Sequence, residues 1–183
     1  TTTTSNVSNF EAITISDDLD GNINVSDVQE DGINTITLGE TGAATLVNGA
    51  EQITGEAGTF TVNLGASAAA NTGSVLNGAL TIVDSGTATT DSLVIKNTGA
   101  NTTTNLRLDV LAGQAITSTG YENVTIDTNT ALGGNVRHDV GILTITPDAA
   151  SAAISATITG GNSIDIATRI ASTTTGALTI DAS

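Results

Sequence analysis

Residues 16–27 carry the densest set of candidate metal ligands in the chain. The segment reads SDDLDGNINVSD, so oxygen-bearing side chains recur at alternate positions around one glycine. Ca²⁺ takes about six to eight hard oxygen ligands in a compact turn, and this pattern can supply them. The alternative is an acidic Asx-turn on a solvated surface. We expect a calcium site whose ligand candidates are Asp18, Asp20, Asn22 or Asn24, and Asp27.

Other acidic residues are spread along the chain. Glu30 and Asp31 follow the calcium segment closely enough to complete its site. Further single carboxylates stand at the ends of predicted strands, where each could bind metal between stacked turns, although each alone is more typical of a turn residue. These residues are Asp84, Asp91, Asp127, Asp148, Asp165 and Asp181.

The side chains needed for catalysis are scarce, and we expect no enzyme. His138 is the single histidine, and the adjacent Asp139 points to the opposite face of a strand, so a catalytic triad is not indicated. A polysaccharide lyase would need clustered bases, and the chain has only 4 of them. A groove that joined Arg107, Arg137, Asp109 and Asp139 would revive that option.

Composition and charge exclude several classes of partner. The 183 residues carry a net charge of -15, which repels nucleic acids and anionic lipids. No apolar run approaches the roughly 18 residues of a membrane helix, so we expect no membrane insertion. There is no Cys, and aromatic residues make up 2% of the chain, so the core must be aliphatic and small. The absence of Met at Thr1 indicates a processed chain or a fragment.

Short runs of alternating apolar and polar residues predict β-strands along the whole length, with almost no helix. Examples are ITI at 13–15, TITL at 35–38 and TFTVNL at 59–64, with Gly, Asn, Asp and Ser between the runs. Near copies recur as GALTI at 78–82, GILTI at 141–145 and GALTI at 176–180. Because internal repeats favour stacked coils, we expect an all-β β-solenoid, with a β-sandwich as the alternative.

The expected solenoid has a narrow interior and one elongated module. Alanine pairs and triplets fit an interior that is too tight for aromatic rings. The module spans residues 1–183, and the low-complexity segment 66–74 is a possible boundary between an acidic N-terminal part and a repetitive C-terminal part. The alternative is a surface loop within one domain. Thr-x-Thr motifs recur, as an ice-binding face would require, but not at constant spacing in the sequence.

The repeated segments resemble a known family. NFEAITI at 9–15, GYENVTI at 120–126 and LTIDAS at 178–183 are similar to repeats of Gram-negative surface-layer proteins and type I-secreted adhesins. The resemblance implies a calcium-dependent β-solenoid that assembles on the outer cell surface and is exported without a cleaved N-terminal signal. The glycine-rich calcium nonapeptides of that family are missing here.

We therefore expect an extracellular, cell-surface structural module whose main partner is itself, in a homo-oligomer, lattice or filament. A cell-surface polysaccharide is a further expected partner. The alternative function is a phage fibre or carbohydrate-binding β-helix module, for which the scarcity of aromatic side chains is unfavourable. An ice-binding protein and a polysaccharide lyase fit the sequence less well.

Overall fold

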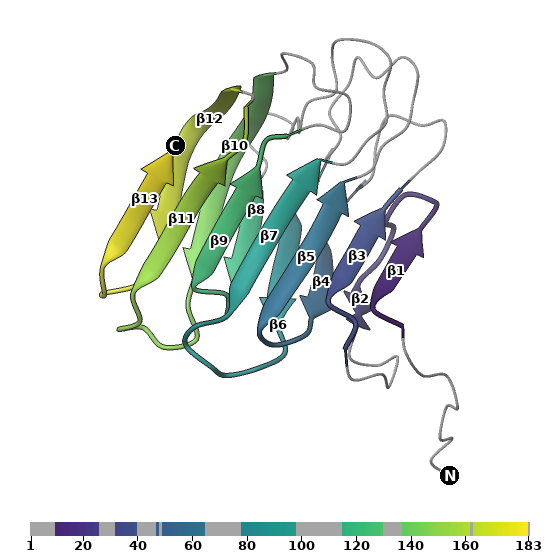
Figure 1. Ribbon diagram of the computed structural model, residues 1–183, viewed down its shortest axis with the longest axis horizontal. Coiled ribbons are helices and arrows are strands. Elements are labelled where there is room, and N and C mark those ends of the chain that lie inside the picture. The colour runs from purple at the N-terminus through teal and green to yellow at the C-terminus, as the bar shows by residue number, and fades with distance from the viewer. Residues whose placement is uncertain are drawn as a thin grey trace.

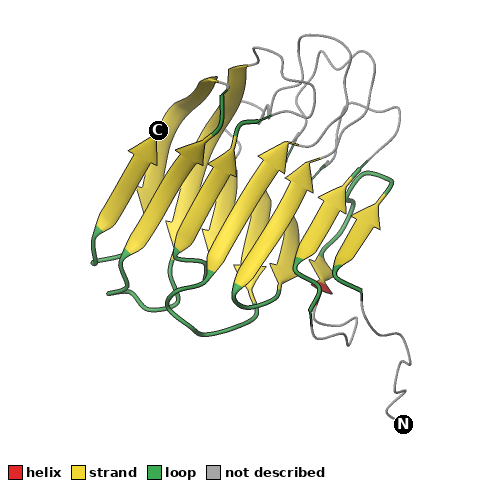
Figure 2. Cartoon of the chain, viewed as in Figure 1, coloured by secondary structure: helices red, strands yellow, loops and turns green. Residues whose placement is uncertain are grey.

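The computed structural model describes residues 10–25, 32–39, 47, 49–64, 78–97, 115–129, 137–161 and 163–182. Its strands form two parallel sheets, and consecutive strands alternate between them (Figures 1 and 2). The odd-numbered sheet contains β1 (Ala12–Ile15), β3 (Thr35–Leu38), β5 (Thr59–Leu64), β7 (Ser92–Asn97), β9 (Asn123–Asp127), β11 (Ile154–Thr159) and β13 (Leu178–Ala182). The even-numbered sheet contains β2 (Ile23–Asn24), β4 (Glu51–Gly55), β6 (Leu80–Asp84), β8 (Ala115–Thr119), β10 (Arg137–Thr146) and β12 (Ser163–Ser172).

Each strand pairs with the strand two positions along the chain, and every such pair is parallel. The chain is therefore a β-solenoid, as the sequence predicted, because each coil lays one strand on each sheet. A sandwich of hairpins would have paired neighbouring strands antiparallel. Residues 66–74, the possible boundary, lie outside the described residues. On either side of them the sheets continue, since β5 pairs with β7 and β4 with β6.

The core lies between the two sheets and consists of aliphatic rows. Because side chains alternate along a strand and the coils stack in register, an inward residue contacts its counterpart in the next coil. One row of the odd-numbered sheet runs through Ile36, Val62, Ile95 and Ile126, all of them buried. Each buried side chain of this size contributes about 1.5–3 kcal/mol relative to an exposed one.

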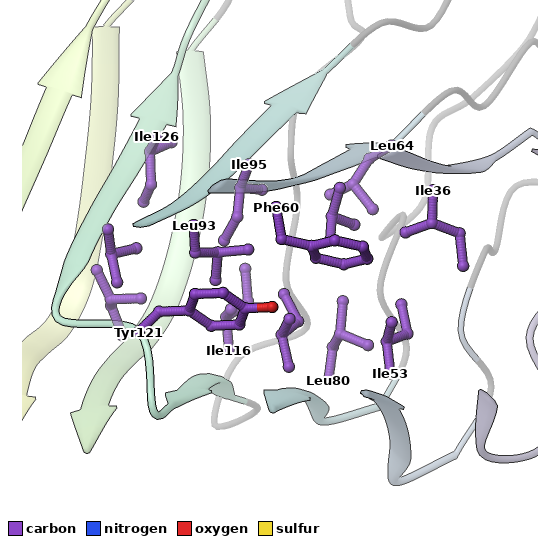
Figure 3. Packing of buried hydrophobic residues seen from close by; sticks show 14 of the residues in the cluster. Ile36, Ile53, Phe60, Leu64, Leu80, Leu93, Ile95, Ile116, Tyr121 and Ile126 are labelled. Atoms are coloured by element: carbon purple, nitrogen blue, oxygen red, sulfur yellow. The ribbon is translucent and has the colours of Figure 1, made fainter. Parts of the chain in front are cut away.

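The interior also holds two aromatic rings, so the expectation of a space too tight for rings was wrong. Phe60 and Tyr121 are fully buried, and their rings stack with centroids 6.3 Å apart and an interplanar angle of 14°. Figure 3 shows both rings among the aliphatic side chains, with the Tyr121 hydroxyl pointing along the stack. Gly55 makes the room, because a Cβ there would lie 2.5 Å from Oη of Tyr121 and 2.6 Å from Cδ1 of Phe60.

We expect Gly120→Ala to destabilise the chain more than Gly58→Ala. Both glycines have a left-handed φ, +85° at Gly120 and +90° at Gly58. A methyl group on Gly58 meets open space, whereas one on Gly120 would lie 2.7 Å from Cβ of Asp84. The free energy of unfolding in urea should fall by about 1–2 kcal/mol for Gly58→Ala and by a further 1 kcal/mol or so for Gly120→Ala. Equal losses of stability in the two variants would contradict the close contact between Gly120 and Asp84.

Candidate functional site

The most unusual chemistry lies at the edge of the solenoid where even-numbered strands turn into odd-numbered ones, at the bottom of Figure 1. Here the ladder of backbone hydrogen bonds continues from coil to coil through the turns. Ser92 N donates to Gly58 O at 2.7 Å, and Glu122 N donates to Asp91 O at 3.1 Å. These stacked turns form the acidic corner, which comprises residues 56–58, 84–91, 120–122 and 147–148.

Three carboxylates of the acidic corner are buried. The exposed fraction is 7% for Asp84, 5% for Asp91 and 1% for Glu122. One oxygen of each carboxylate, Oδ2 of the two aspartates and Oε2 of the glutamate, is buried with no hydrogen-bond partner. A buried acceptor without a partner costs about 1–3 kcal/mol, and more when it is charged. The corner therefore concentrates negative charge that the protein itself does not satisfy.

The second oxygen of each carboxylate holds a turn in place. Asp91 Oδ1 accepts a hydrogen bond from Gly58 N at 3.0 Å, which joins two neighbouring coils. Glu122 Oε1 accepts from Asp148 N at 3.0 Å and so joins its coil to the following one. Asp84 Oδ1 accepts from Gly86 N at 2.9 Å within its own turn. These bonds fix the orientation of the carboxylates.

Asp84 and Asp91 form a pair, because the carboxyl group of Asp91 acts directly on that of Asp84. Burial raises the pKa of Asp84 to about 7, and the neighbouring carboxyl group of Asp91 and the charge of Asp148 act in the same direction. The Gly86 amide works against this rise in pKa. In the described part of the chain no base forms an ion pair with either carboxyl group, so a proton is what relieves their repulsion in the metal-free protein.

Tyr121 spans the acidic corner along the axis of the stack. It lies in the turn before β9, and its hydroxyl donates to the backbone oxygen of Glu56, at 2.9 Å, in the turn after β4. Burial raises the pKa of this hydroxyl, and the charges of Asp84, Asp91 and Glu56 raise it further. Tyr121 thus stays neutral as a donor close to the carboxyl pair.

The predicted calcium ligands lie elsewhere. Asp18, Asp20 and Asn22 are in the loop from β1 to β2, at the edge opposite the acidic corner, and Asn24 is on β2. Asp20 and Asn24 are exposed, and Asp27 lies outside the described residues. Across the described ranges, no three His, Cys, Asp or Glu side chains converge as a metal site. Calcium binding in this loop stays a prediction.

The loop from β1 to β2 has a structural anchor as well. Asn22 Oδ1 accepts a hydrogen bond from Gln52 N at 2.8 Å, so this predicted ligand oxygen ties the loop to β4. Leu19, in the middle of the loop, is buried and forms a parallel bridge with Val47. The apolar residue between the acids therefore secures the loop to the next coil.

The side chains of His138, Arg137 and Asp139, on β10, lie outside the described part, as do Arg107 and Asp109. A convergence of these groups stays untested.

Threonines align on the outer face of the odd-numbered sheet, although their spacing in the sequence is irregular. Loop lengths absorb the irregularity, so strands pair in register. One row runs through Thr35, Thr61, Val94, Thr125 and Thr157. The next row contains Lys96 and Asp127, so the surface is not a uniform threonine array.

Stability of the metal-free chain should fall as the pH rises from about 4 to about 7. The pKa of Asp84 is raised in the folded state, to about 7 from 3.8, so the folded state binds one more proton than the unfolded state in this window. The free energy of unfolding then falls with pH by at most about 1.4 kcal/mol per unit for this group. Denaturant titrations in the presence of chelator will measure the slope.

Asp84→Asn should flatten this pH dependence, whereas Asp20→Asn, at an exposed position, should leave it unchanged. An identical slope in the wild-type chain and the Asp84→Asn variant would contradict a proton held by the carboxyl pair.

Comparison with known proteins adds no assignment. The chain matches no protein-family model, no curated protein and no solved structure. In the described residues no helix is long and apolar enough to cross a membrane. The function must therefore be argued from the geometry of the solenoid itself.

Proposed function

We propose that this chain is a structural module of an extracellular, cell-surface assembly and that it self-associates by stacking one solenoid on the end of another. One observation carries the proposal. Leu178 and Ile180 on β13 align with Ile154 and Ala156 on β11, which are buried in the core. Yet Leu178 is 40% exposed and Ile180 is 53% exposed. Side chains at core positions of β13 are thus left uncovered by the described residues.

β13 is the last strand of the odd-numbered sheet and has a partner, β11, on one side (Figure 1). The other side presents backbone groups suited to another parallel strand. A further coil would supply these hydrogen bonds and cover the apolar side chains at the same time. This is the interaction by which coils already stack within the module.

The opposite end of the stack offers a suitable surface. β1 is the first strand of the odd-numbered sheet, and its Ile13 and Ile15 are only partly buried. Its segment NFEAITI, at 9–15, is similar to GYENVTI, at 120–126, which covers all of β9 except its last residue, Asp127. β9 has a parallel neighbour on both sides. β1 therefore has the sequence of an internal strand, and we propose that β13 of one copy pairs with β1 of the next.

The extracellular placement rests on composition, because the chain is rich in threonine and acidic. The proposed role is structural and requires no catalytic group. It agrees with the resemblance to surface-layer and adhesin repeats, in which solenoids form a lattice or a stalk.

The test is the molar mass of the chain as a function of concentration, measured by sedimentation or by light scattering after gel filtration. We expect the mass to rise with concentration for the wild-type chain. The double variant Leu178→Asp with Ile180→Asp should remain monomeric, because charges at core positions block a further coil. Thr179→Asp is the matched control, since it places a charge on the outward side of the same strand.

Circular dichroism will check that each variant keeps its β structure. A wild-type chain that stays monomeric at the highest concentrations would refute the proposal. So would association that is equally strong in the double variant.

A further inference from the structure

We propose that the carboxyl pair Asp84 and Asp91 in the acidic corner binds a hard divalent cation, with Ca²⁺ as the ion to test. Both side chains are more than nine-tenths buried, and Oδ2 of each has no hydrogen-bond partner. The site is separate from Asp18, Asp20 and Asn22 of the predicted calcium segment, which lie in the loop from β1 to β2 at the opposite edge of the solenoid.

The two carboxylates are held in place before any ion arrives. Oδ1 of Asp84 is fixed by the Gly86 amide and Oδ1 of Asp91 by the Gly58 amide. Each Oδ2 is thereby left free while its carboxylate cannot rotate away without losing a hydrogen bond. Oriented carboxylate oxygens with no other partner are the ligands that Ca²⁺ and Mg²⁺ prefer.

Charge favours a divalent ion over a proton. One proton between two buried carboxylates leaves one negative charge uncompensated, whereas a divalent cation balances both. Asp148 adds negative charge, since it acts on Asp84 electrostatically. The described bases, Lys96 on β7 and Arg169 on β12, form no ion pair with the two carboxylates. The net charge of -15 also raises the local concentration of cations.

Two carboxylate oxygens are fewer ligands than Ca²⁺ takes, so the remaining ones must be main-chain carbonyls and water. An ion bound by Asp84 and Asp91 would join the two ends of the β6–β7 turn. Asp91 in this turn already accepts a hydrogen bond from the Gly58 amide of the preceding coil. The effect of the ion would be to stiffen the solenoid.

Tyr121 provides a selective probe for this site. It is the only tyrosine, the chain has no tryptophan, and its side chain lies close enough to Asp84 and Asp91 to feel their charges. Tb³⁺, which replaces Ca²⁺ at oxygen sites, luminesces when it receives energy from a nearby excited tyrosine. Because this transfer weakens steeply with distance, an ion in the acidic corner should give a signal and one bound at 16–27 should give little.

The experiment titrates the chelator-treated full chain with Tb³⁺ at neutral pH under excitation of tyrosine, then adds excess Ca²⁺. Thermal unfolding with and without Ca²⁺ is followed on the same samples. We expect a saturable Tb³⁺ signal that Ca²⁺ reverses, and a higher melting temperature with Ca²⁺. Asp84→Asn and Asp91→Asn should each weaken binding by about tenfold or more.

Two controls separate this site from the alternatives. Asp18→Asn with Asp20→Asn removes acids from the loop at 16–27 and should leave both effects intact. Tyr121→Phe should abolish the luminescence while the rise in melting temperature with Ca²⁺ persists.

The proposal is overturned if the folded wild-type chain gives neither a tyrosine-sensitised signal nor a change in melting temperature. That outcome would mean that the Asp84–Asp91 pair binds a proton and no metal ion. It is also overturned if the loop variant, and not the Asp84 and Asp91 variants, loses the Ca²⁺ effect. The wild-type measurements alone decide whether an ion binds near Tyr121, even if an Asn variant fails to fold. Neither result depends on self-association, because the acidic corner lies inside one copy.

Discussion

Each described strand of this solenoid pairs in parallel with a strand two positions away along the chain, with a register shift within the β10–β12 pair, and the rest of the structure depends on that constraint. It places each side chain beside its counterpart in the next coil, so a residue that suits the core in one coil needs a similar neighbour in the next. The row Ile36, Val62, Ile95 and Ile126 meets this need inside the molecule. No single coil could bury such a core alone, and stability therefore comes from the stack.

The same constraint makes repeated charge destabilising, because acids at the same position in successive coils would lie side by side and repel each other. Asp84 avoids this by standing beside Gly55 in the preceding coil and close to Gly120 in the following one. Its negative neighbour comes instead from Asp91, across the turn of its own coil. Tyr121 then passes this coil and bonds to Glu56 beyond it. The two glycines thus make room for the acid and for the aromatic ring.

The fold could be predicted from the sequence, whereas the acidic corner could not. Alternation within strands is local, and repeats such as GALTI are visible at once. The corner depends on residues brought together by register: Asp91 bonds to Gly58, 33 residues away, and Tyr121 to Glu56, 65 residues away. Connections of unequal length hide this register. The sequence therefore predicts Asp84 and Asp91 as separate turn residues, and it marks Glu122 only as part of a repeat. The sequence signal for the carboxyl pair is that one acid stands on each side of the turn between β6 and β7.

The ends and the corner together explain how a stack of small side chains could serve as a rod. Edge strands usually carry charges or irregularities that prevent further pairing. β13 carries one charge, Asp181, but its LTI segment also occurs in the internal strands β6 and β10, and it directs Leu178 and Ile180 to core positions. Inside the stack, the bond between Gly58 and Asp91 joins neighbouring turns, and the bond between Tyr121 and Glu56 joins turns that are two coils apart. A rod needs both features, because a stiff stack of coils transmits force along a rod only when the end of one copy can be joined to the next copy.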